Sequence, residues 1–507
     1  MDELDELEEI EFEHAITSAG FGKFNIFHLL VCGAVYAVTA LGVTVLSFVL
    51  PAAACDFEMS STNKGVLSGA PMIGMLVGSY FWGCLADTKG RKIVLVYTLI
   101  LDGICGIVSS AMPIYTLFLA LRLCNGFLIA GAMGICFSYL GEFQATKYRE
   151  TVLSWMELFW TIGLLWLPLI AWVVIPLDIQ FGHFKSWNLF VAISSLPSLV
   201  IGIALLYFPE SPKFLLEVGE PEAALRVLKR IYVMNSGKTE TEYPVNSLRE
   251  TEREYKYLQR HQSIRRLRIH RRKELSILLR TFWDQTKELC RPPNLKLTLL
   301  TCFLQVGILT SYYTLMMWFP ELFDRFERYE RTHPNETTSV CEVSEVRLEN
   351  NIDCDNPIGE QVFVHTLIVG MACVPTSCWL LMCVRKLGAK FFLMFSLTIA
   401  SISVIFLYYV TNSTQNLMLS CLFESMASLA SSASYSVMVD LFPTNLRVMA
   451  TSLALTVGRV GAVLGNMMFG YLIDIHCFVP IIIFATSLMC SAILCMFLPE
   501  TGQESLG

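Results

Sequence analysis

Twelve stretches of mostly apolar residues follow one another along this chain of 507 residues. Each is long enough to cross the hydrocarbon core of a bilayer as an α-helix, which takes about 20 residues. Hydrophobic residues make up 54% of the chain and charged residues 16%, unlike an average water-soluble domain. We therefore predict an all-α integral membrane protein with twelve transmembrane helices. The stretches lie at about 27–50, 65–86, 93–112, 114–140, 151–176, 186–208, 296–319, 361–384, 391–410, 416–441, 448–474 and 478–498.

Basic residues gather in the loops that follow the even-numbered stretches. Lys89 and Arg91 follow the second stretch, Lys147 follows the fourth, and Arg385 and Lys386 follow the eighth. The alternate short loops carry almost no Lys or Arg. Because loops rich in Lys and Arg stay on the cytosolic side, this pattern predicts that both termini are cytosolic.

An internal repeat predicts how the helices are grouped. Three pairs of residues are 298 positions apart: Gly90 with Gly388, Glu142 with Asp440, and Arg149 with Arg447. Two Pro-Glu pairs, at 209–210 and 499–500, are 290 apart. This register indicates two parallel halves of six helices. The predicted parts are an acidic cytosolic N-terminus at 1–23, a first half at 24–208, a cytosolic linker at 209–295, a second half at 296–498 and a cytosolic tail at 499–507.

Two loops are long and differ in charge. The linker holds 18 Lys and Arg against 12 Asp and Glu, which suits short helices at an anionic leaflet. The loop 321–360 holds 4 Lys and Arg against 11 Asp and Glu, which suits the lumenal or extracellular side. There Cys341 and Cys354 are a candidate disulfide and Asn335 is a candidate glycosylation site. Cys55 and Cys477 are expected on the same side, so the pairing stays open.

A turn motif at 83–92 joins the second and third stretches. Gly83 and Gly90 permit a tight turn, Asp87 can accept from a helix N-terminus, and Arg91 follows. The structural alternative is an ordinary basic turn, which explains Arg91 but neither the aspartate nor both glycines. We expect a latch that holds the two halves together on the cytosolic side. Close approach of the second and eleventh helices would use two small-residue faces, Gly74 to Gly78 and Gly461 to Gly465.

The motif closely resembles the signature loop of the major facilitator superfamily. Further segments resemble the synaptic vesicle glycoprotein 2 family and its organic-ion-transporter-like relatives, over residues 20 to 505. They include Ser138 to Phe143, Ser154-Trp155 with Phe159-Trp160, Pro209 to Phe214, Tyr312-Tyr313, and Trp318 to Pro320. The resemblance implies a major facilitator fold that works by alternating access around a midplane site. It also makes Tyr312, Tyr313 and Trp160 candidates for the substrate cavity.

Ionisable residues inside apolar stretches are functional candidates because they are costly in hydrocarbon. Asp102 and Arg122 lie at similar depth on consecutive helices, so we predict a buried ion pair. Glu157, Glu424 and Arg459 also lie inside apolar stretches. Glu424 is on the tenth helix, which the resemblance places beside the cavity; it can carry a proton or pair with a cationic substrate. A pair with Arg459 is the equally weighted alternative.

Two acidic residues are followed at the same spacing by an arginine, at the ends of the fourth and tenth helices. These are Glu142 with Arg149, and Asp440 with Arg447. A charge network that closes and opens the cytosolic side is the functional interpretation, and an exposed pair of little energetic value is the alternative.

Together these patterns predict a transporter of a small organic solute, with an organic cation favoured. No phosphate loop, nucleophile elbow or metal-binding run appears, so we expect neither an enzyme nor a cofactor or metal site. The net charge of −7 argues against nucleic acid as a partner. The expected partners are the solute, a coupling ion and the bilayer of a plasma or vesicle membrane, with the protein a monomer. The alternative is a non-transporting vesicle glycoprotein or receptor, favoured by the absence of acidic residues in the first helix.

Overall fold

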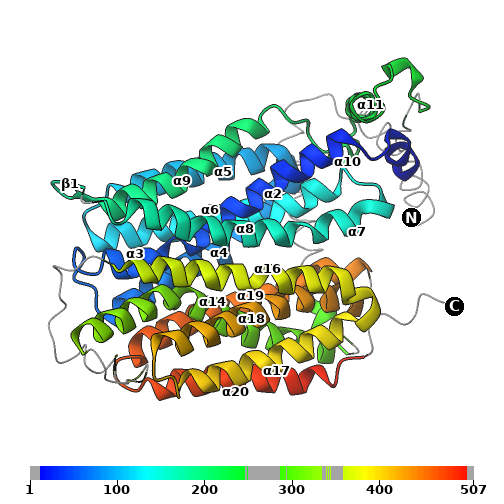
Figure 1. Ribbon diagram of the computed structural model, residues 1–507. Coiled ribbons are helices and arrows are strands. Elements are labelled where there is room, and N and C mark those ends of the chain that lie inside the picture. The colour runs from blue at the N-terminus through cyan, green and yellow to red at the C-terminus, as the bar shows by residue number, and fades with distance from the viewer. Residues whose placement is uncertain are drawn as a thin grey trace.

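The computed structural model describes residues 12–177, 179–245, 248, 286–292, 294–333, 339, 341, 343, 358–442 and 444–499. Long helices lie roughly parallel in two groups, one above the other in Figure 1. The first group is formed by α2 (Lys23–Thr44), α3 (Leu46–Ala52), α4 (Ser61–Lys89), α5 (Arg91–Ser110), α6 (Tyr115–Gly141), α7 (Thr146–Ser154), α8 (Met156–Val174) and α9 (Ser186–Leu205). The second is formed by α14 (Leu295–Thr332), α16 (Glu360–Leu387), α17 (Ala389–Leu407), α18 (Ser413–Leu441), α19 (Thr444–Leu472) and α20 (Phe478–Cys495).

Shorter elements lie at the two ends of the bundle. We call the end at which α2 begins and α20 ends the terminal face, and the opposite end the distal face. A small antiparallel hairpin of β1 (Gln180–Phe181) and β2 (Phe184–Lys185) lies at the distal face (Figure 1). At the terminal face the linker forms α10 (Pro212–Glu217), α11 (Pro221–Ser236) and η1 (Glu240–Glu242). Residues 249–285 of the linker, which carry 11 of its 18 Lys and Arg, lie outside the described residues.

Eleven helical segments of the described chain are long and apolar enough to cross a membrane. In two of them a pair of consecutive helices, α2 with α3 and α7 with α8, forms a single segment. The helix α18 is the twelfth long helix; its 29 residues include eight serines and Glu424, which lower its mean hydropathy. The described chain therefore has the predicted helical architecture, with helices long and apolar enough to cross a membrane.

The helix α14 is longer than hydropathy predicts. We expected a loop from residue 321, but the helix continues to Thr332. Three ion pairs with i,i+4 spacing run along this extension: Glu321 with Arg325 at 3.1 Å, Asp324 with Arg328 at 2.9 Å, and Glu327 with Arg331 at 2.5 Å. Such pairs stabilise the polar extension of a helix whose earlier part is apolar.

The two halves share two local features, a glycine with a positive φ angle before the third helix and a lysine two residues after it. Gly90 and Gly388 both have positive φ angles, 104° and 79°, and directly precede α5 and α17. Two residues after each glycine, a lysine ammonium donates to a carbonyl beyond the last helix of its half. Lys92 reaches the Leu206 oxygen at 2.9 Å, and Lys390 reaches the Leu498 oxygen at 2.5 Å. Each half is therefore tied together by its own third helix.

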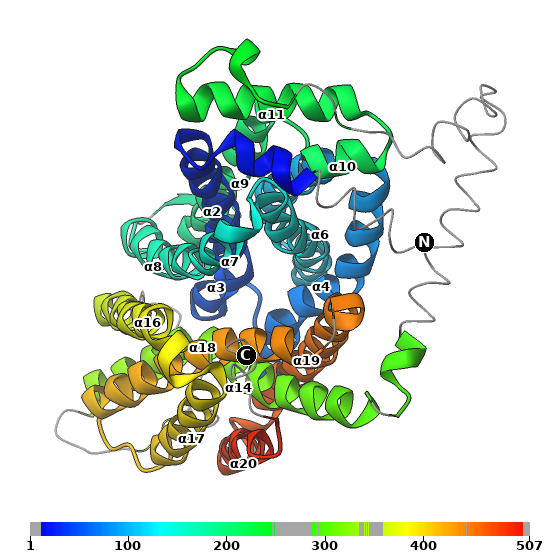
Figure 2. The ribbon, with the colours of Figure 1, turned by 90° about the vertical axis from the view of Figure 1, so that its right-hand side faces the viewer.

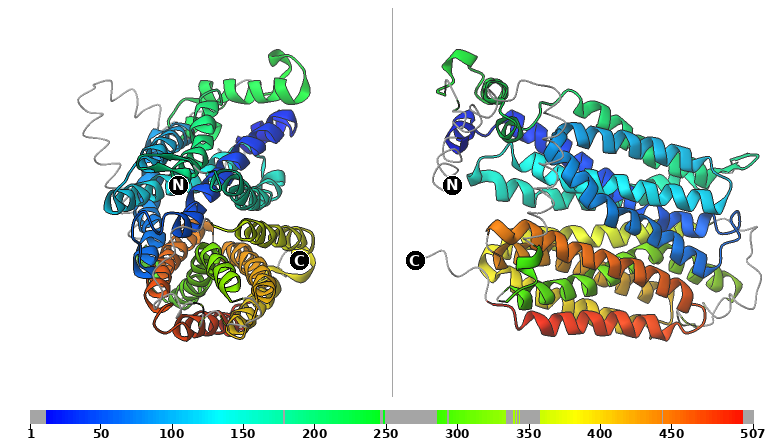
Figure 3. Two further views of the ribbon diagram at one scale, coloured as in Figure 1. Left: turned by 60° about the vertical axis from the view of Figure 1, so that its left-hand side comes forward. Right: turned by 180° about the vertical axis from the view of Figure 1, so that it is seen from behind.

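The interface between the halves is made by α4 with α19, α8 with α16, and α3 with α14. Figure 2, viewed from the terminal face, and Figure 3 show the two groups lying against each other along it. The expectation for the small-residue faces is wrong. Gly74 and Gly78 pack against the backbone of α6, and Gly461 and Gly465 pack against α14, so both faces serve contacts inside a half.

A different glycine pair lets α4 and α19 approach each other. A Cβ atom on Gly470 would lie 2.7 Å from the Gly65 Cα, and one on Gly65 would lie 3.0 Å from the Gly470 Cα. Gly65 is near the start of α4 and Gly470 near the end of α19, so this crossing is close to the distal face. The two halves therefore touch backbone to backbone at that end.

Candidate functional site

A cavity lies between the two halves, on the distal side of the molecule. Its volume is small, about 40 Å³, and its lining comes from α2, α3 and α8 of the first half and α14, α16 and α18 of the second. Most of the lining is apolar, and only four lining residues carry a polar side chain. The lining residues are Thr44, Ser47, Phe48, Leu164, Leu167, Pro168, Met316, Phe319, Thr366, Val369, Gly370 and Glu424.

Glu424 is the one charged residue in this lining. Its side chain is buried, with 2% of the residue exposed, and neither carboxylate oxygen has a hydrogen-bond partner. The expected alternative, a pair with Arg459, is not present among the described contacts. Arg459 donates instead to the Ser79 hydroxyl of α4, across the interface between the halves. Glu424 is therefore a buried carboxyl group without a protein counter-charge in the part of the chain that is described.

The three aromatic candidates come together beside Glu424. The Trp160 indole nitrogen in α8 lies 3.4 Å from the Tyr312 hydroxyl in α14, so the contact joins the two halves. The Tyr312 and Tyr313 ring centroids are 5.3 Å apart, and Tyr312 is close enough to Glu424 to interact with it electrostatically. Tyr36 also belongs to this aromatic cluster, with its ring centroid 5.2 Å from that of Trp160. Sequence reasoning missed Tyr36 because an aromatic residue in an apolar stretch carries no distinguishing signal.

The predicted ion pair of Asp102 and Arg122 is bridged by a third residue. The Asn125 amide oxygen accepts from Arg122 at 3.2 Å, and the amide nitrogen of Asn125 donates to Asp102. The Ser198 hydroxyl donates to the second Asp102 oxygen at 2.9 Å. All of these side chains are buried, so the network links α5, α6 and α9 inside the first half. The two charges interact electrostatically without direct contact, because Asn125, one helical turn after Arg122, is hydrogen-bonded to both.

The turn motif ties the first half to the linker. Arg91 contacts Glu142 at 3.1 Å, Glu217 of α10 at 3.3 Å and Asp87 at 3.5 Å. Burial raises the pKa of Glu142, and the neighbouring Arg91 opposes that rise. Among the described residues, the ion pair of Asp87 is with Arg91 of the same half, so the latch to the second half stays a prediction. Gly83 lies inside α4 and forms no turn.

Glu142 and Arg149 do not pair with each other. Glu142 is held by Arg91, while Arg149 lies 3.9 Å from Glu13 and donates to the Gly141 and Gln144 carbonyls. The identical spacing therefore does not mark an ion pair in the first half. The side chains of Asp440 and Arg447 lie outside what the structure describes.

The predicted disulfide is wrong. Cys341 is bonded to Cys477, with Cα atoms 5.4 Å apart, and Cys55 is also disulfide-bonded. Cys354 and Asn335 lie outside the described residues. The Cys341–Cys477 bond joins the segment after α14 to the turn between α19 and α20. Sequence could not select among the cysteines expected on this side, because their pairing depends on how the loops fold back.

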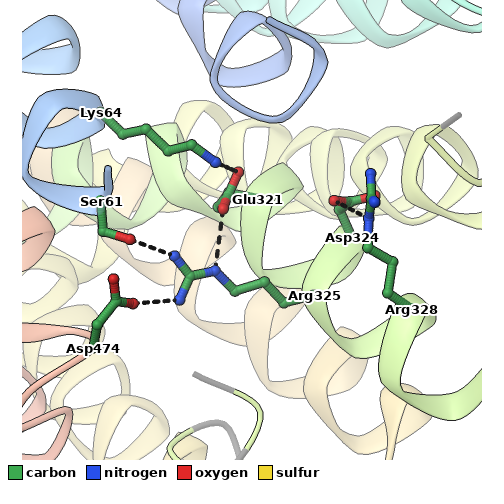
Figure 4. A network of polar contacts seen from close by, with 7 residues as sticks. All are labelled: Ser61, Lys64, Glu321, Asp324, Arg325, Arg328 and Asp474. Carbon is green, nitrogen blue, oxygen red and sulfur yellow. Dashed lines mark hydrogen bonds and ion pairs between the residues drawn. The ribbon is translucent and has the colours of Figure 1, made fainter. Parts of the chain in front are cut away.

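An ion-pair network at the distal face was not predicted (Figure 4). Lys64 of α4 and Glu321 of α14 form a 2.6 Å pair, and both side chains are fully buried. Arg325 contacts Glu321 at 3.1 Å, Asp474 at 2.9 Å and the Ser61 hydroxyl at 2.9 Å. Since Ser61 and Lys64 belong to the first half and the others to the second, the network closes the interface at the distal face. The network residues lay outside the predicted apolar stretches, except Asp474 at the very end of one, so they were not considered.

Comparison with known proteins identifies the family. A model of the family described as sugar (and other) transporter matches residues 19–324 and 346–507. Synaptic vesicle glycoprotein 2C of Mus musculus is 27% identical, over 98% of this chain and 81% of that protein. Synaptic vesicle glycoprotein 2A of Rattus norvegicus is 32% identical, over 62% of this chain and 43% of that protein.

Solved structures show the same fold at low sequence identity. The partially occluded inward-open xylose transporter XylE from E. coli has a TM-score of 0.68 and 15% identity, covering 96% of this chain and 100% of that one. Its inward-open conformation has a TM-score of 0.66 and 16% identity, covering 95% and 98%. The chain therefore belongs to the sugar (and other) transporter family of the major facilitator superfamily, in its synaptic vesicle glycoprotein 2-like branch.

Proposed function

We propose that this protein transports a small organic cation by alternating access, with Glu424 as the counter-charge of the bound cation. The observation that carries the proposal is the unpartnered, buried carboxylate in the apolar cavity between the halves. A cationic solute would supply the missing counter-charge, and the apolar lining would cover its body. The attraction between the Glu424 carboxylate and the cation would be strong because the surroundings contain little water.

The same lining argues against a sugar as the substrate. A sugar carries several hydroxyl groups, and each buried one needs a hydrogen-bond partner. Besides Glu424 the cavity offers the hydroxyls of Thr44, Ser47 and Thr366 only. Phe48, Phe319 and Met316 instead give contact area to an apolar or aromatic cation.

The proposed cycle uses the two faces of the molecule. The terminal face, with its basic loops, would be cytosolic, and the distal face lumenal or extracellular. The buried network of Lys64, Glu321 and Arg325 would keep the distal side shut while substrate exchanges on the terminal side. The protein would act as a monomer in a plasma or vesicle membrane.

Uptake of radiolabelled 1-methyl-4-phenylpyridinium into proteoliposomes tests the proposal. We expect uptake by the wild type and a loss of roughly 10- to 100-fold in Glu424→Gln, because a charge-assisted contact contributes about 1.5–3 kcal/mol. Glu360→Gln is the matched control: it removes one negative charge at an exposed position in the first turn of α16 and should leave uptake unchanged.

Two results would contradict the proposal. Equal uptake by Glu424→Gln and the wild type would show that Glu424 is not the counter-charge of the bound cation. Absence of uptake by a folded wild type, with no thermal shift by any of a panel of organic cations, would favour the non-transporting alternative.

A further inference from the structure

Polar side chains recur at every fourth position in the distal part of α18. They are Asn412, which caps the helix and is exposed at the distal face, and then Asn416, Ser420 and Glu424. Side chains four residues apart on a helix are neighbours, because the helix has 3.6 residues per turn. We call these four residues the polar row. It leads from the distal surface to the carboxyl group in the cavity, over about 18 Å at 1.5 Å per residue.

The three inner residues of the polar row are buried and unpaired. Asn416 is 1% exposed, Ser420 0% and Glu424 2%. Within the described chain, none of their side-chain polar atoms has a hydrogen-bond partner: both amide atoms of Asn416, the Ser420 hydroxyl and both Glu424 carboxyl oxygens. A buried polar group without a partner is costly, and nearly all such groups in folded proteins are paired. The polar row therefore points to a polar ligand that the surrounding helices do not supply.

Two other buried serines of the second half show that an unpaired hydroxyl is not inherent to these helices. The Ser425 hydroxyl, also on α18, donates to the Cys421 carbonyl at 2.6 Å. The Ser401 hydroxyl on α17 donates to the Ala485 carbonyl at 2.8 Å. Ser425 therefore serves as a matched control for Ser420, since both hydroxyls are buried on one helix and only one of them is paired.

The chemistry of the polar row suits water. An amide, a hydroxyl and a protonated carboxyl group each donate and accept hydrogen bonds, as water does. Proteins hold internal water where buried polar groups lack other partners, and water bridges groups that cannot reach each other directly. A metal cation would use oxygen ligands only and would leave the Asn416 amide nitrogen unpaired. The polar row is therefore suited to water rather than to a metal ion.

The aromatic cluster covers the opposite side of the cavity. The helices α8 and α14 both run towards the distal face, and Trp160 and Tyr312 each lie four residues before a lining residue, Leu164 and Met316. Their 3.4 Å contact joins the two halves on the terminal side of the cavity. Polar groups therefore lead from Glu424 to the distal face, whereas aromatic rings separate it from the terminal face.

Glu424 is the group on this path that titrates near neutral pH. The other titratable groups of the described chain that interact with it electrostatically are Tyr312 of α14, Cys373 of α16 and Cys421 of α18. Phenols and thiols ordinarily titrate above about pH 8. Lys390, the one charged residue of α17, lies at its terminal end, and Arg459 of α19 is hydrogen-bonded across the interface. Glu330 of α14 lies at the distal end of the polar row, where its carboxylate accepts from the Ser413 backbone nitrogen at 3.0 Å.

We propose that the polar row holds a file of water through which Glu424 exchanges its proton with the distal compartment while the Lys64 network is closed. The proton passes from a Glu424 oxygen to water beside Ser420 and on to bulk water at Asn412, and a proton that enters takes the reverse path. An organic cation and a proton then compete for Glu424, so acid on the distal side weakens cation binding. This consequence rests on the proposed function, but the water path can be tested without transport.

Infrared spectroscopy of the purified full-length protein tests the water path. The carbonyl stretch of protonated Glu424 is the band that Glu424→Gln removes, and it shifts when D₂O replaces H₂O. Asn416→Leu removes the amide at nearly constant volume and should slow this exchange by roughly 10-fold, the effect of one lost hydrogen bond on a rate. Ser420→Ala should slow it as well, whereas Ser425→Ala should exchange like the wild type.

Ser420→Ala keeps the test decisive if Asn416→Leu does not fold, because it deletes a single hydroxyl. Equal exchange rates in the wild type and in the folded variants of the polar row would overturn the inference. The absence at every pH of a band that Glu424→Gln removes would do the same.

Distal pH tests the consequence for transport. In proteoliposomes of one orientation, uptake of 1-methyl-4-phenylpyridinium from the terminal side should fall when the distal side alone is acidified, because protonation removes the charge of Glu424. Asn416→Leu should lose this inhibition, and Ser425→Ala should keep it. Inhibition that persists in Asn416→Leu would overturn the inference. A wild type that takes up no cation would contradict the proposed function instead and leave the infrared result standing.

Discussion

Gly90 shows how a single residue fixes a motif. Its φ of 104° and ψ of 146° lie in a region that side-chain-bearing residues rarely adopt. An added Cβ would also meet the Glu210 carboxylate and lie 3.1 Å from the Phe214 ring. Glu210 accepts from the Lys92 backbone nitrogen at 2.9 Å, so the glycine is needed to bring the linker against α5.

We expect Gly90→Ala to destabilise the protein by about 1–3 kcal/mol through backbone strain and this steric conflict. Gly83→Ala is the matched control, because Gly83 lies in a helix with no atom within 4 Å of an added Cβ. That change should be neutral or stabilise by about 0.5–1 kcal/mol. Apparent melting temperatures of the purified variants in detergent measure the difference, and equal values would refute the account.

A single residue can carry a signal by itself, and the structure places Glu424 in the lining of the cavity. Glu424 stands out because an acidic group in an apolar stretch is rare, and Gly90 because it follows a basic turn. Partners were predicted poorly, because they depend on segments far apart in sequence. Arg149 meets Glu13 rather than Glu142, and Asn125 separates Asp102 from Arg122. Lys64 was overlooked because it directly precedes an apolar stretch.

At the scale of elements, the contact between α4 and α14 closes the distal face. Hydropathy predicted both helices but ended the second one at the first charged residue. The charged extension of α14 supplies Glu321 and Arg325 to the network with Lys64 (Figure 4). A buried pair that joins two moving bodies stabilises one arrangement of them, whereas a pair within one helix does not discriminate between arrangements.

We therefore expect Lys64→Ala to favour opening at the distal face. Breaking a buried pair from one side costs up to about 3–5 kcal/mol, and the remaining contact of Glu321 with Arg325 keeps the cost towards the lower value. Cys373, a buried thiol in α16, reports the opening. Its labelling by a membrane-impermeant maleimide from the distal side should rise in Lys64→Ala.

Arg328→Ala is the control for that experiment. It breaks the 2.9 Å pair with Asp324, and both residues of that pair belong to α14. Labelling of Cys373 should stay at the wild-type level. If both variants label alike, the Lys64 pair has no role in closure.

At the scale of the whole molecule, the sequence repeat predicted the grouping of the helices into two halves, which the two groups of long helices match. Its register survives in the paired glycines before α5 and α17 and in the paired lysines that follow them. The small-residue faces did not indicate how the halves meet, because the same pattern serves contacts within a half. Which glycines face outward depends on helix rotation, which the sequence spacing leaves open.

The disulfide gives a test of both connectivity and orientation. Peptide mapping without reduction should find Cys341 linked to Cys477 in protein taken from membranes. Cys341→Ser and Cys477→Ser should destabilise the protein equally, on the order of 2–5 kcal/mol. An oxidised bond and a glycan at Asn335 would place the distal face in the lumen or outside the cell. Detection of a Cys341–Cys354 peptide would contradict the structure.

The backbone contact of Gly65 with Gly470 can act as a pivot about which the two halves rock. It lies near one end of α4, whose 29 residues extend about 43 Å at 1.5 Å per residue. With this contact as a fulcrum, a tilt of roughly 10° would displace the far end of the helix by about 7 Å. A slight rocking near the distal face would therefore open a wide gap at the terminal face. A side chain added at either glycine would push the two helices apart at the pivot.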